Sequence, residues 1–275
     1  MKTLTKDLTI TAFGATTSIA TAVLLALVET HLNIAIYSFS FLFVIPVGSF
    51  MAGLLAATGY VLGARFFNHR PGALLVLSIL AVSTSTFFIV HYLNYNWLQI
   101  GIFQVHVRDH IPFKEYLRLV LTHAAIETRH FGSTGELGTL GYVYAGLQIL
   151  GFSFGGLGAY CWLLTMPYCE TCSKYFAHKV TIDRYADDPD KLVAFMETLV
   201  SALKADHVAK AIKLYKDFGS SELKGRPVRI QLKLWGCKKC ARNAFRFTVS
   251  KLNGNTWDEI SDLKQEGVTQ EKLSV

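Results

Sequence analysis

The chain has 275 residues, of which 51% are hydrophobic and only 17% are charged, and its formal net charge is +7. A soluble domain carries about a quarter charged residues, so this composition argues against a wholly soluble protein. The charged residues are unevenly distributed, and the long segments without them indicate the architecture.

Four segments lack charged residues and are long enough to cross a bilayer, which requires about 20 apolar residues. They are residues 8–28, 32–64, 72–90 and 137–165. We therefore expect a mostly α membrane protein with four transmembrane helices within residues 1–165, followed by a polar domain at 166–275. The first segment exceeds the roughly 7 to 15 apolar residues of a signal-peptide core, so we interpret it as a helix.

Lys and Arg near the ends of the expected helices predict the orientation. Lys2 and Lys6 precede the first helix, and Arg65 and Arg70 lie between the second and third. The polar domain is also rich in Lys and Arg, which favours cytoplasmic N- and C-termini and the plasma (inner) membrane. The connection between the third and fourth helices carries basic residues too, and these oppose that orientation.

Small residues indicate close helix packing within the expected bundle. Gly59 and Gly63 form one G-x-x-x-G pattern, and Gly151 and Gly155 form another. This spacing lets two helix backbones approach closely in lipid, either within one chain or in a homo-oligomer. Hydroxyl residues are frequent and could line a pore, although they also bond to carbonyls of their own helix. The uncharged segments contain no acid or base, which argues against a proton-coupled transporter.

The connection between the third and fourth helices predicts an amphipathic helix at about 111–130, on the outer membrane surface or capping the bundle. On such a helix His123, Glu127 and His130 share one face. Imidazole and carboxylate groups at this spacing can chelate zinc or iron. The alternative is a surface or packing role for the same residues.

Two C-x-x-C pairs lie in the polar domain, Cys169 with Cys172 and Cys237 with Cys240. In a reducing cytosol such pairs bind a metal more often than they form disulfides. Four thiolates complete a tetrahedral shell, so we expect a structural zinc ion. A dithiol redox pair and unligated thiols are the alternatives.

Alternating apolar residues predict one strand entering the second cysteine pair, at 226–237, and another leaving it, at 244–257. Two cysteine turns at the ends of short strands resemble a zinc ribbon. The resemblance implies a small α+β cytosolic domain that binds zinc. The chain departs from the ribbon pattern at Ser173 and Ala241, where glycine is frequent. Residues 188–219 predict two amphipathic helices, a helical insertion between the cysteine pairs.

A basic stretch surrounds the second cysteine pair. Its candidate surface residues are Arg226, Arg229, Lys233, Lys238, Lys239, Arg242 and Arg246. They could form a solvated strand face, offset the thiolate charge and attract the anionic inner leaflet. Nucleic-acid binding would use the same charges with Trp235, Phe245 and Phe247 as stacking surfaces, but Phe245 and Phe247 alternate toward the expected core. An acidic protein partner is the third possibility.

The sequence lacks a Walker loop, a G-x-S-x-G motif, an H-E-x-x-H motif and a Rossmann fingerprint, which favours a non-enzymatic role. We expect an integral membrane anchor, adaptor or sensor whose zinc-stabilised cytosolic domain docks a protein partner. The first alternative is an oligomeric pore or membrane-perturbing effector gated by that domain. The second is a membrane dithiol oxidoreductase. Quinone-linked enzymes of that kind share the numbers of helices and cysteine pairs but carry the pairs at the outer face.

Overall fold

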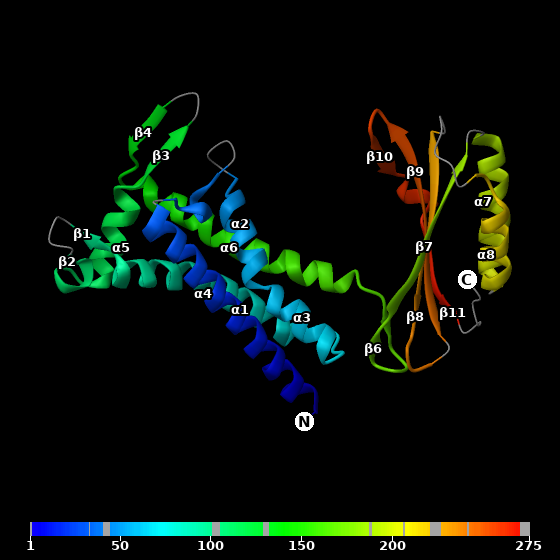
Figure 1. Cartoon of the computed structure of the whole chain (residues 1–275), viewed down its shortest axis with the longest axis horizontal. Helices are drawn as coiled ribbons and strands as arrows, with labels where there is room; N and C mark the ends of the chain where they lie inside the picture. The colour runs from blue at the N-terminus through cyan, green and yellow to red at the C-terminus, as the bar shows by residue number, and fades with distance from the viewer. Residues whose placement is uncertain are drawn as a thin grey trace. The chain divides into compact units, whose positions relative to one another are not determined.

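The computed structural model describes residues 2–32, 34–40, 45–100, 105–128, 132–186, 189–205, 207–220, 227–240 and 242–269. The chain forms two compact units, Met1–Thr165 and Met166–Val275. We refer to them as the helical unit and the C-terminal unit (Figure 1).

Four helices of the helical unit are long and apolar enough to cross a membrane, as the uncharged segments predict. These spans are Leu4–Leu32, Val47–Phe66, Ala73–Trp97 and Leu140–Leu164. They belong to α1 (Lys2–Leu32), α2 with α3 (Val47–Ala56 and Thr58–Phe66), α4 (Ala73–Trp97) and α6 (Leu140–Leu164). The second span begins later than its uncharged segment because Pro46 is the N-cap of α2, and the short 3-10 helix η1 (Ile36–Ser38) precedes it.

The four glycines of the G-x-x-x-G patterns pack against helices of the same chain. A Cβ atom on Gly59 would lie 2.3 Å from the carbonyl oxygen of Phe13 on α1. One on Gly155 would lie 2.1 Å from that of Phe50 on α2, and Gly63 and Gly151 also face neighbouring helices. Only glycine permits such close backbone approach, so these patterns serve packing within the chain.

Apolar side chains cover the outside of the four helices, and Leu8, Leu77 and Phe154 are each more than half exposed. A bilayer accommodates such a surface, whereas water does not. Several hydroxyl groups bond to carbonyls of their own helix, including Thr86 to Val82 over 3.0 Å.

The connection between α4 and α6 contains several short elements. They are β1 (Gln99–Ile100), β2 (Val105–His106), the 3-10 helix η2 (Val107–Asp109), α5 (Phe113–Thr122), β3 (Ala125–Thr128) and β4 (Gly132–Glu136). The prediction of a helix at about 111–130 is therefore wrong in its extent. The β-branched residues Ile126 and Thr128 favour a strand, and Gly135 adopts a φ of +72° in the strand that pairs with it.

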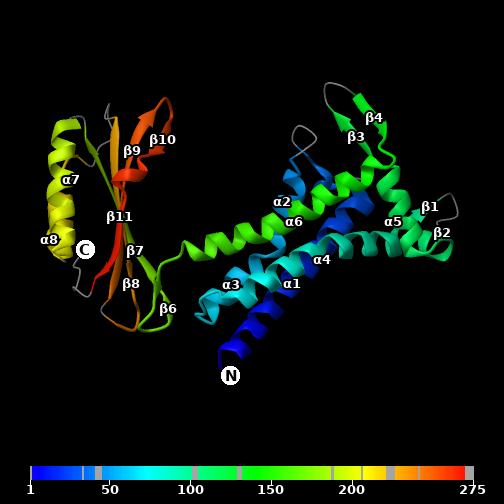
Figure 2. The same cartoon turned by 180° about the vertical axis from the view of Figure 1, so that it is seen from behind.

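The C-terminal unit contains an antiparallel five-stranded sheet. Its strands are β7 (Ala177–Ala186), β8 (Val228–Gly236), β9 (Asn243–Asn253), β10 (Thr256–Glu259) and β11 (Gln265–Thr269). The order is β10-β9-β8-β7, and β11 also pairs with β9, alongside residues 243–247. The helices α7 (Pro189–Lys204) and α8 (Val208–Asp217) lie on one face of the sheet, as Figures 1 and 2 both show.

Apolar residues alternate along β8 and β9 and form the core beneath the helices. Ile230, Leu232 and Leu234 are buried with Phe247 and Val249 beneath the two helices. The expected strands around the second cysteine pair are thus confirmed, and the helical insertion between the pairs is α7 and α8. The opposite sheet face carries the intervening polar residues.

Candidate metal centre

Each cysteine pair lies in the turn of a hairpin. Cys169 ends β5 (Tyr168–Cys169), which pairs with β6 (Lys174–Tyr175) so that Cys169 lies opposite Lys174. The second pair connects β8 to β9, whose last register partners are Gly236 and Asn243. The fold therefore brings two turns together that lie far apart in the sequence.

The four sulfur atoms of Cys169, Cys172, Cys237 and Cys240 all lie within 4.8 Å of one another. Cys169 Sγ and Cys240 Sγ are 3.7 Å apart, far beyond the roughly 2.05 Å of a disulfide. A tetrahedral ion with metal–sulfur bonds of about 2.3 Å separates its ligands by about 3.8 Å. The cluster could therefore hold a tetrahedral metal ion such as zinc.

Backbone groups hold both turns in this geometry. The amide of Lys239 donates to Cys237 Sγ over 3.5 Å, and the amide of Cys237 donates to the Arg242 carbonyl over 3.0 Å. In the first turn Ser173 adopts a φ of +49°, in the left-handed region where glycine is favoured. This conformation explains why glycine is frequent at that position of a zinc-binding turn.

The thiol pKa values reflect the close packing of the four sulfurs. Burial raises the pKa of Cys169, and the hydrogen bond with Cys240 is the main cause that raises the pKa of Cys172 to about 12. Burial opposes ionisation of Cys237 as well, but bonds from the Lys239 and Cys240 amides and from neighbouring thiols lower its pKa to about 6. Ionisation of Cys237 is thus favoured while that of Cys169 and Cys172 is disfavoured, and a bound cation would favour the thiolate form of its ligands.

The cluster has an apolar backing and basic residues beside it. Cys169 packs with Phe176 and Ala244, and Trp235 contacts the same group. Lys238 and Lys239 are exposed in the second turn. Four thiolates around a divalent ion leave a formal charge of minus two, which nearby cations offset.

Arg229, Lys233 and Arg246 lie on the sheet face opposite the helices, and Arg242 lies in the turn before β9. Lys233 and Arg246 are register partners on β8 and β9, and Arg246 pairs with Glu266 over 2.9 Å. The guanidinium of Arg246 lies 5.7 Å from the Trp235 ring, and that of Arg229 lies 4.9 Å from the Trp257 ring. Arg226 is outside the described residues.

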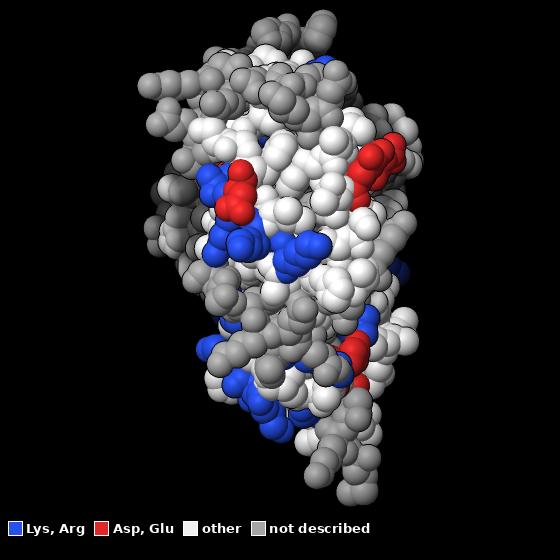
Figure 3. Space-filling model, turned by 90° about the vertical axis from the view of Figure 1, so that its right-hand side faces the viewer, with Lys and Arg blue, Asp and Glu red and all other residues white. Residues whose placement is uncertain are grey.

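The aromatic residues of the basic stretch do not form one exposed surface. Phe245 and Phe247 are both buried in the core, so they are not available for stacking. On the side of the C-terminal unit seen in Figure 3, Lys and Arg form several groups with fewer Asp and Glu between them. On this face the basic residues are therefore divided among several groups.

The histidine candidates do not form a cluster among the described residues. His123 follows α5, where its Nδ1 lies 3.1 Å from the Leu119 carbonyl oxygen and its Nε2 lies 3.8 Å from Glu136. Glu127 belongs to β3 instead of a shared helix face, and His130 is outside the described residues. Within the described ranges, the four cysteines are the only group of three or more His, Cys, Asp or Glu close enough to hold a metal.

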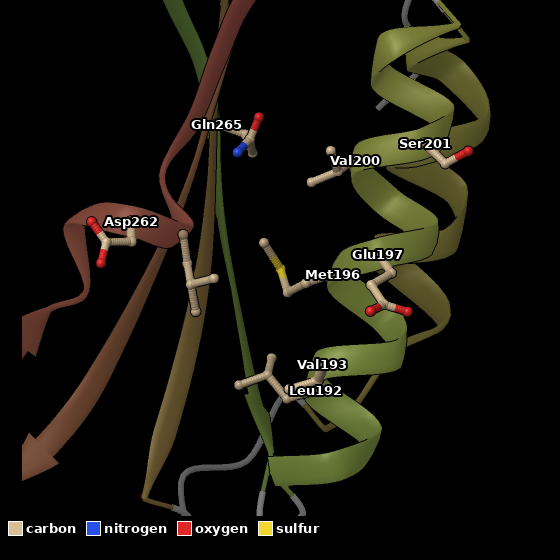
Figure 4. Close-up of a pocket in the computed structure, with 9 residues that line it drawn as sticks. Leu192, Val193, Met196, Glu197, Val200, Ser201, Asp262 and Gln265 are labelled. Atoms are coloured by element: carbon tan, nitrogen blue, oxygen red, sulfur yellow. The ribbon is translucent and has the colours of Figure 1, made fainter.

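An apolar groove between α7 and the β11 edge was not expected from the sequence (Figure 4). Its volume is about 580 Å³, and Met196 and Val200 of α7 point toward Gln265 of β11. The i, i+4 spacing of Leu192, Met196 and Val200 was a signal for this face of α7. Nothing in the sequence indicated that β11 would lie across from it.

No protein-family model, curated protein or solved structure matches the chain. The interpretation of the cysteine cluster therefore depends on its own geometry and chemistry.

Proposed function

We propose that the chain is an integral membrane anchor or adaptor whose C-terminal unit binds one structural zinc ion and docks a protein partner in the cytosol. The proposal orients both termini toward the cytoplasm of the inner membrane, in agreement with Lys2, Lys6, Arg65 and Arg70. The helices supply the attachment, and the C-terminal unit supplies the surface.

The ligand set favours zinc in a structural role. Four thiolates fill all tetrahedral positions, so no position remains for a substrate or a reactive water. The cluster joins the start of the C-terminal unit to the β8–β9 turn, where a bound ion stabilises the sheet.

The groove between α7 and β11 carries the docking proposal. Among the described strands β11 pairs only with β9, so its outer edge can accept a further strand. Beside that edge lie the apolar side chains of the groove, together with Glu197 and Asp262. An extended peptide could pair its backbone with the β11 edge and place alternating apolar residues in the groove. A Lys or Arg of the same peptide could then form an ion pair with these acids.

Metal content tests the zinc proposal. Purified protein in detergent should contain about one zinc ion per chain by elemental analysis, as four-thiolate sites bind. Cys237→Ser should lose both the ion and protease resistance of the C-terminal unit. Cys161→Ser is the matched control, because Cys161 is exposed on α6 outside the cluster. A metal-free wild type with reversibly oxidised cysteines would favour the dithiol oxidoreductase.

Site-specific photocrosslinking tests docking in the groove. A photoreactive residue at Val193, which is 57% exposed, should give one discrete adduct in intact cells. The same residue at Lys213, exposed on α8 and outside both the groove lining and β11, should not give that adduct. Equal adducts at both positions, or none at Val193, would contradict docking at this groove.

Ion flux separates the adaptor from the pore. Liposomes containing the protein should show no more flux than empty liposomes if the helices serve only as an anchor. Flux that depends on the C-terminal unit would favour the gated pore instead.

A further inference from the structure

A partly buried polar network surrounds the last turn of α1. Both oxygens of the Glu29 carboxylate accept hydrogen bonds from the Tyr37 hydroxyl, at 3.0 and 3.2 Å, and Asn94 Nδ2 also donates to Glu29. No described Lys or Arg forms an ion pair with this carboxylate. A half-buried acid in an apolar bundle is costly unless a partner offsets its charge.

Two neighbouring side chains on α4 have unused polar atoms. Because the Asn94 amide nitrogen faces the carboxylate, its Oδ1 points elsewhere, and this buried oxygen has no partner among the described residues. His91 lies one turn earlier, is 2% exposed, and neither of its ring nitrogens has a described partner. Buried polar atoms are rarely left without partners. Asn94 lines a cavity in which a ligand could supply one, whereas His91 is not among the residues that line it.

A cavity of about 200 Å³ lies beside this network. Glu29, Thr30, Asn94 and Tyr116 line it with oxygen-bearing side chains, together with Ala35 and Leu98. The Thr30 hydroxyl donates to the Ala26 carbonyl over 2.8 Å, so its oxygen keeps a free lone pair. The volume accommodates a small ion with some of its water.

We propose that this cavity binds a monovalent cation, either a hard metal ion such as Na⁺ or K⁺ or a small primary ammonium. Carboxylate, amide and hydroxyl oxygens are ligands for hard cations. The single carboxylate balances one positive charge, whereas a divalent ion would leave a net charge in an apolar bundle. The site is independent of the cysteine cluster and of docking in the C-terminal unit.

The second acid of α1 provides a matched control. Asp7 is also buried, but its carboxylate lies 2.7 Å from His69 Nε2, so a partner within the chain already contacts it. Asp7→Asn and Glu29→Gln therefore remove the same kind of group from the same helix, and only Glu29 lines the cavity.

Thermal unfolding in detergent tests the proposal. Tm is measured in NaCl, KCl or methylammonium chloride and compared with Tm in N-methylglucammonium chloride at the same ionic strength. The wild-type Tm should rise saturably by roughly 5 °C with at least one small cation. Asp7→Asn should keep this rise and Glu29→Gln should lose it. Equal Tm values in all salts, an unchanged rise in Glu29→Gln, or a larger rise with CaCl₂ or MgCl₂ would overturn the proposal.

If Glu29→Gln fails to fold, a direct binding measurement on wild-type protein still tests the proposal. Wild-type protein should broaden the ²³Na resonance, and the small cation that gives the largest Tm rise should reverse the broadening on titration. Broadening equal to that of protein-free micelles, together with a Tm that no small cation raises, would overturn the proposal without any variant.

Discussion

Lys179 Nζ donates a hydrogen bond to Asn243 Oδ1 over 2.7 Å and links β7 to the first residue of β9. The β7–β8 register shifts between His178 and Val180, so Lys179 is the extra residue of a bulge. Its side chain lies over Gly236, where a Cβ atom would come within 2.1 Å of Lys179 Cε. The bulge thus places the Lys179 ammonium group beside the residues that flank the second cysteine turn.

Lys179→Met should weaken metal binding without removing a ligand. The variant loses the bond that orients Asn243, and changes in groups that support metal ligands lower affinity by about 10- to 100-fold. Competition with a chromogenic chelator measures the change. Lys213→Met, at an exposed position of α8, should leave the affinity unchanged. Equal affinities in the two variants would show that the bond does not support the site.

Ser173→Gly should stabilise the C-terminal unit. Ser173 has a φ of +49°, which costs a non-glycine residue about 1 kcal/mol relative to glycine. Denaturant unfolding followed by Trp fluorescence should therefore give a free energy of unfolding about 1 kcal/mol higher. Ala194→Gly, exposed within α7, should lower it by a similar amount. Destabilisation by both glycines would contradict the assigned conformation of Ser173.

Tyr215→Phe should destabilise the C-terminal unit by about 1 to 2 kcal/mol. The Tyr215 hydroxyl contacts the carbonyl oxygens of Ile182 at 2.7 Å and Ile230 at 2.8 Å, on neighbouring strands. Removing it leaves these acceptors without that donor. The control is Tyr185→Phe, since no described residue accepts a hydrogen bond from the half-buried Tyr185 hydroxyl.

Ionisation of Tyr215 should also make the C-terminal unit less stable at alkaline pH. Burial raises the Tyr215 pKa, so the folded state holds this proton more tightly than the unfolded state does. Its contribution is fully present below the unfolded tyrosine pKa of about 10 and declines as pH rises above it. Unfolding free energies at pH 8 to 11 should fall more steeply for wild type than for Tyr215→Phe. Parallel curves would contradict this assignment.

Gly155→Ala should destabilise the helical unit. The added Cβ would meet the Phe50 carbonyl oxygen at 2.1 Å, and a backbone atom cannot move without separating α6 from α2. A lower Tm in detergent is the expected result. Gly146→Ala, on the same helix with nothing within 4 Å of its added Cβ, should be neutral or slightly stabilising. A Tm loss shared by both variants would show that helix packing at Gly155 is not the cause.

The sequence predicted the elements whose signal is local. Long uncharged segments identified the four membrane-length helices, and strict alternation identified β8 and β9. The C-x-x-C spacing identified the cysteine cluster, because two such turns can present four thiols to one ion. These features require no knowledge of neighbouring segments.

Elements that depend on tertiary partners were missed. The alternation of β7 is interrupted by its bulge at Lys179, and β11 has Val268 as its only large apolar residue, so neither resembles an independent strand. Glu29 marked the end of an uncharged segment in the sequence. In the fold α1 continues through Glu29 to Leu32, and Tyr37 and Asn94 donate hydrogen bonds to its carboxylate that only the folded chain brings together.

The pairing of β7 with β8 has a consequence for the order of events during synthesis. Since α7 and α8 separate the two strands in sequence, β7 leaves the ribosome long before its partner exists. Cys169 and Cys172 likewise precede the other half of their cluster. The α7–α8 hairpin has mostly local contacts and can fold first, whereas the sheet and the cysteine cluster must await the later strands. The metal would then be acquired near the end of folding, when the β8–β9 turn closes.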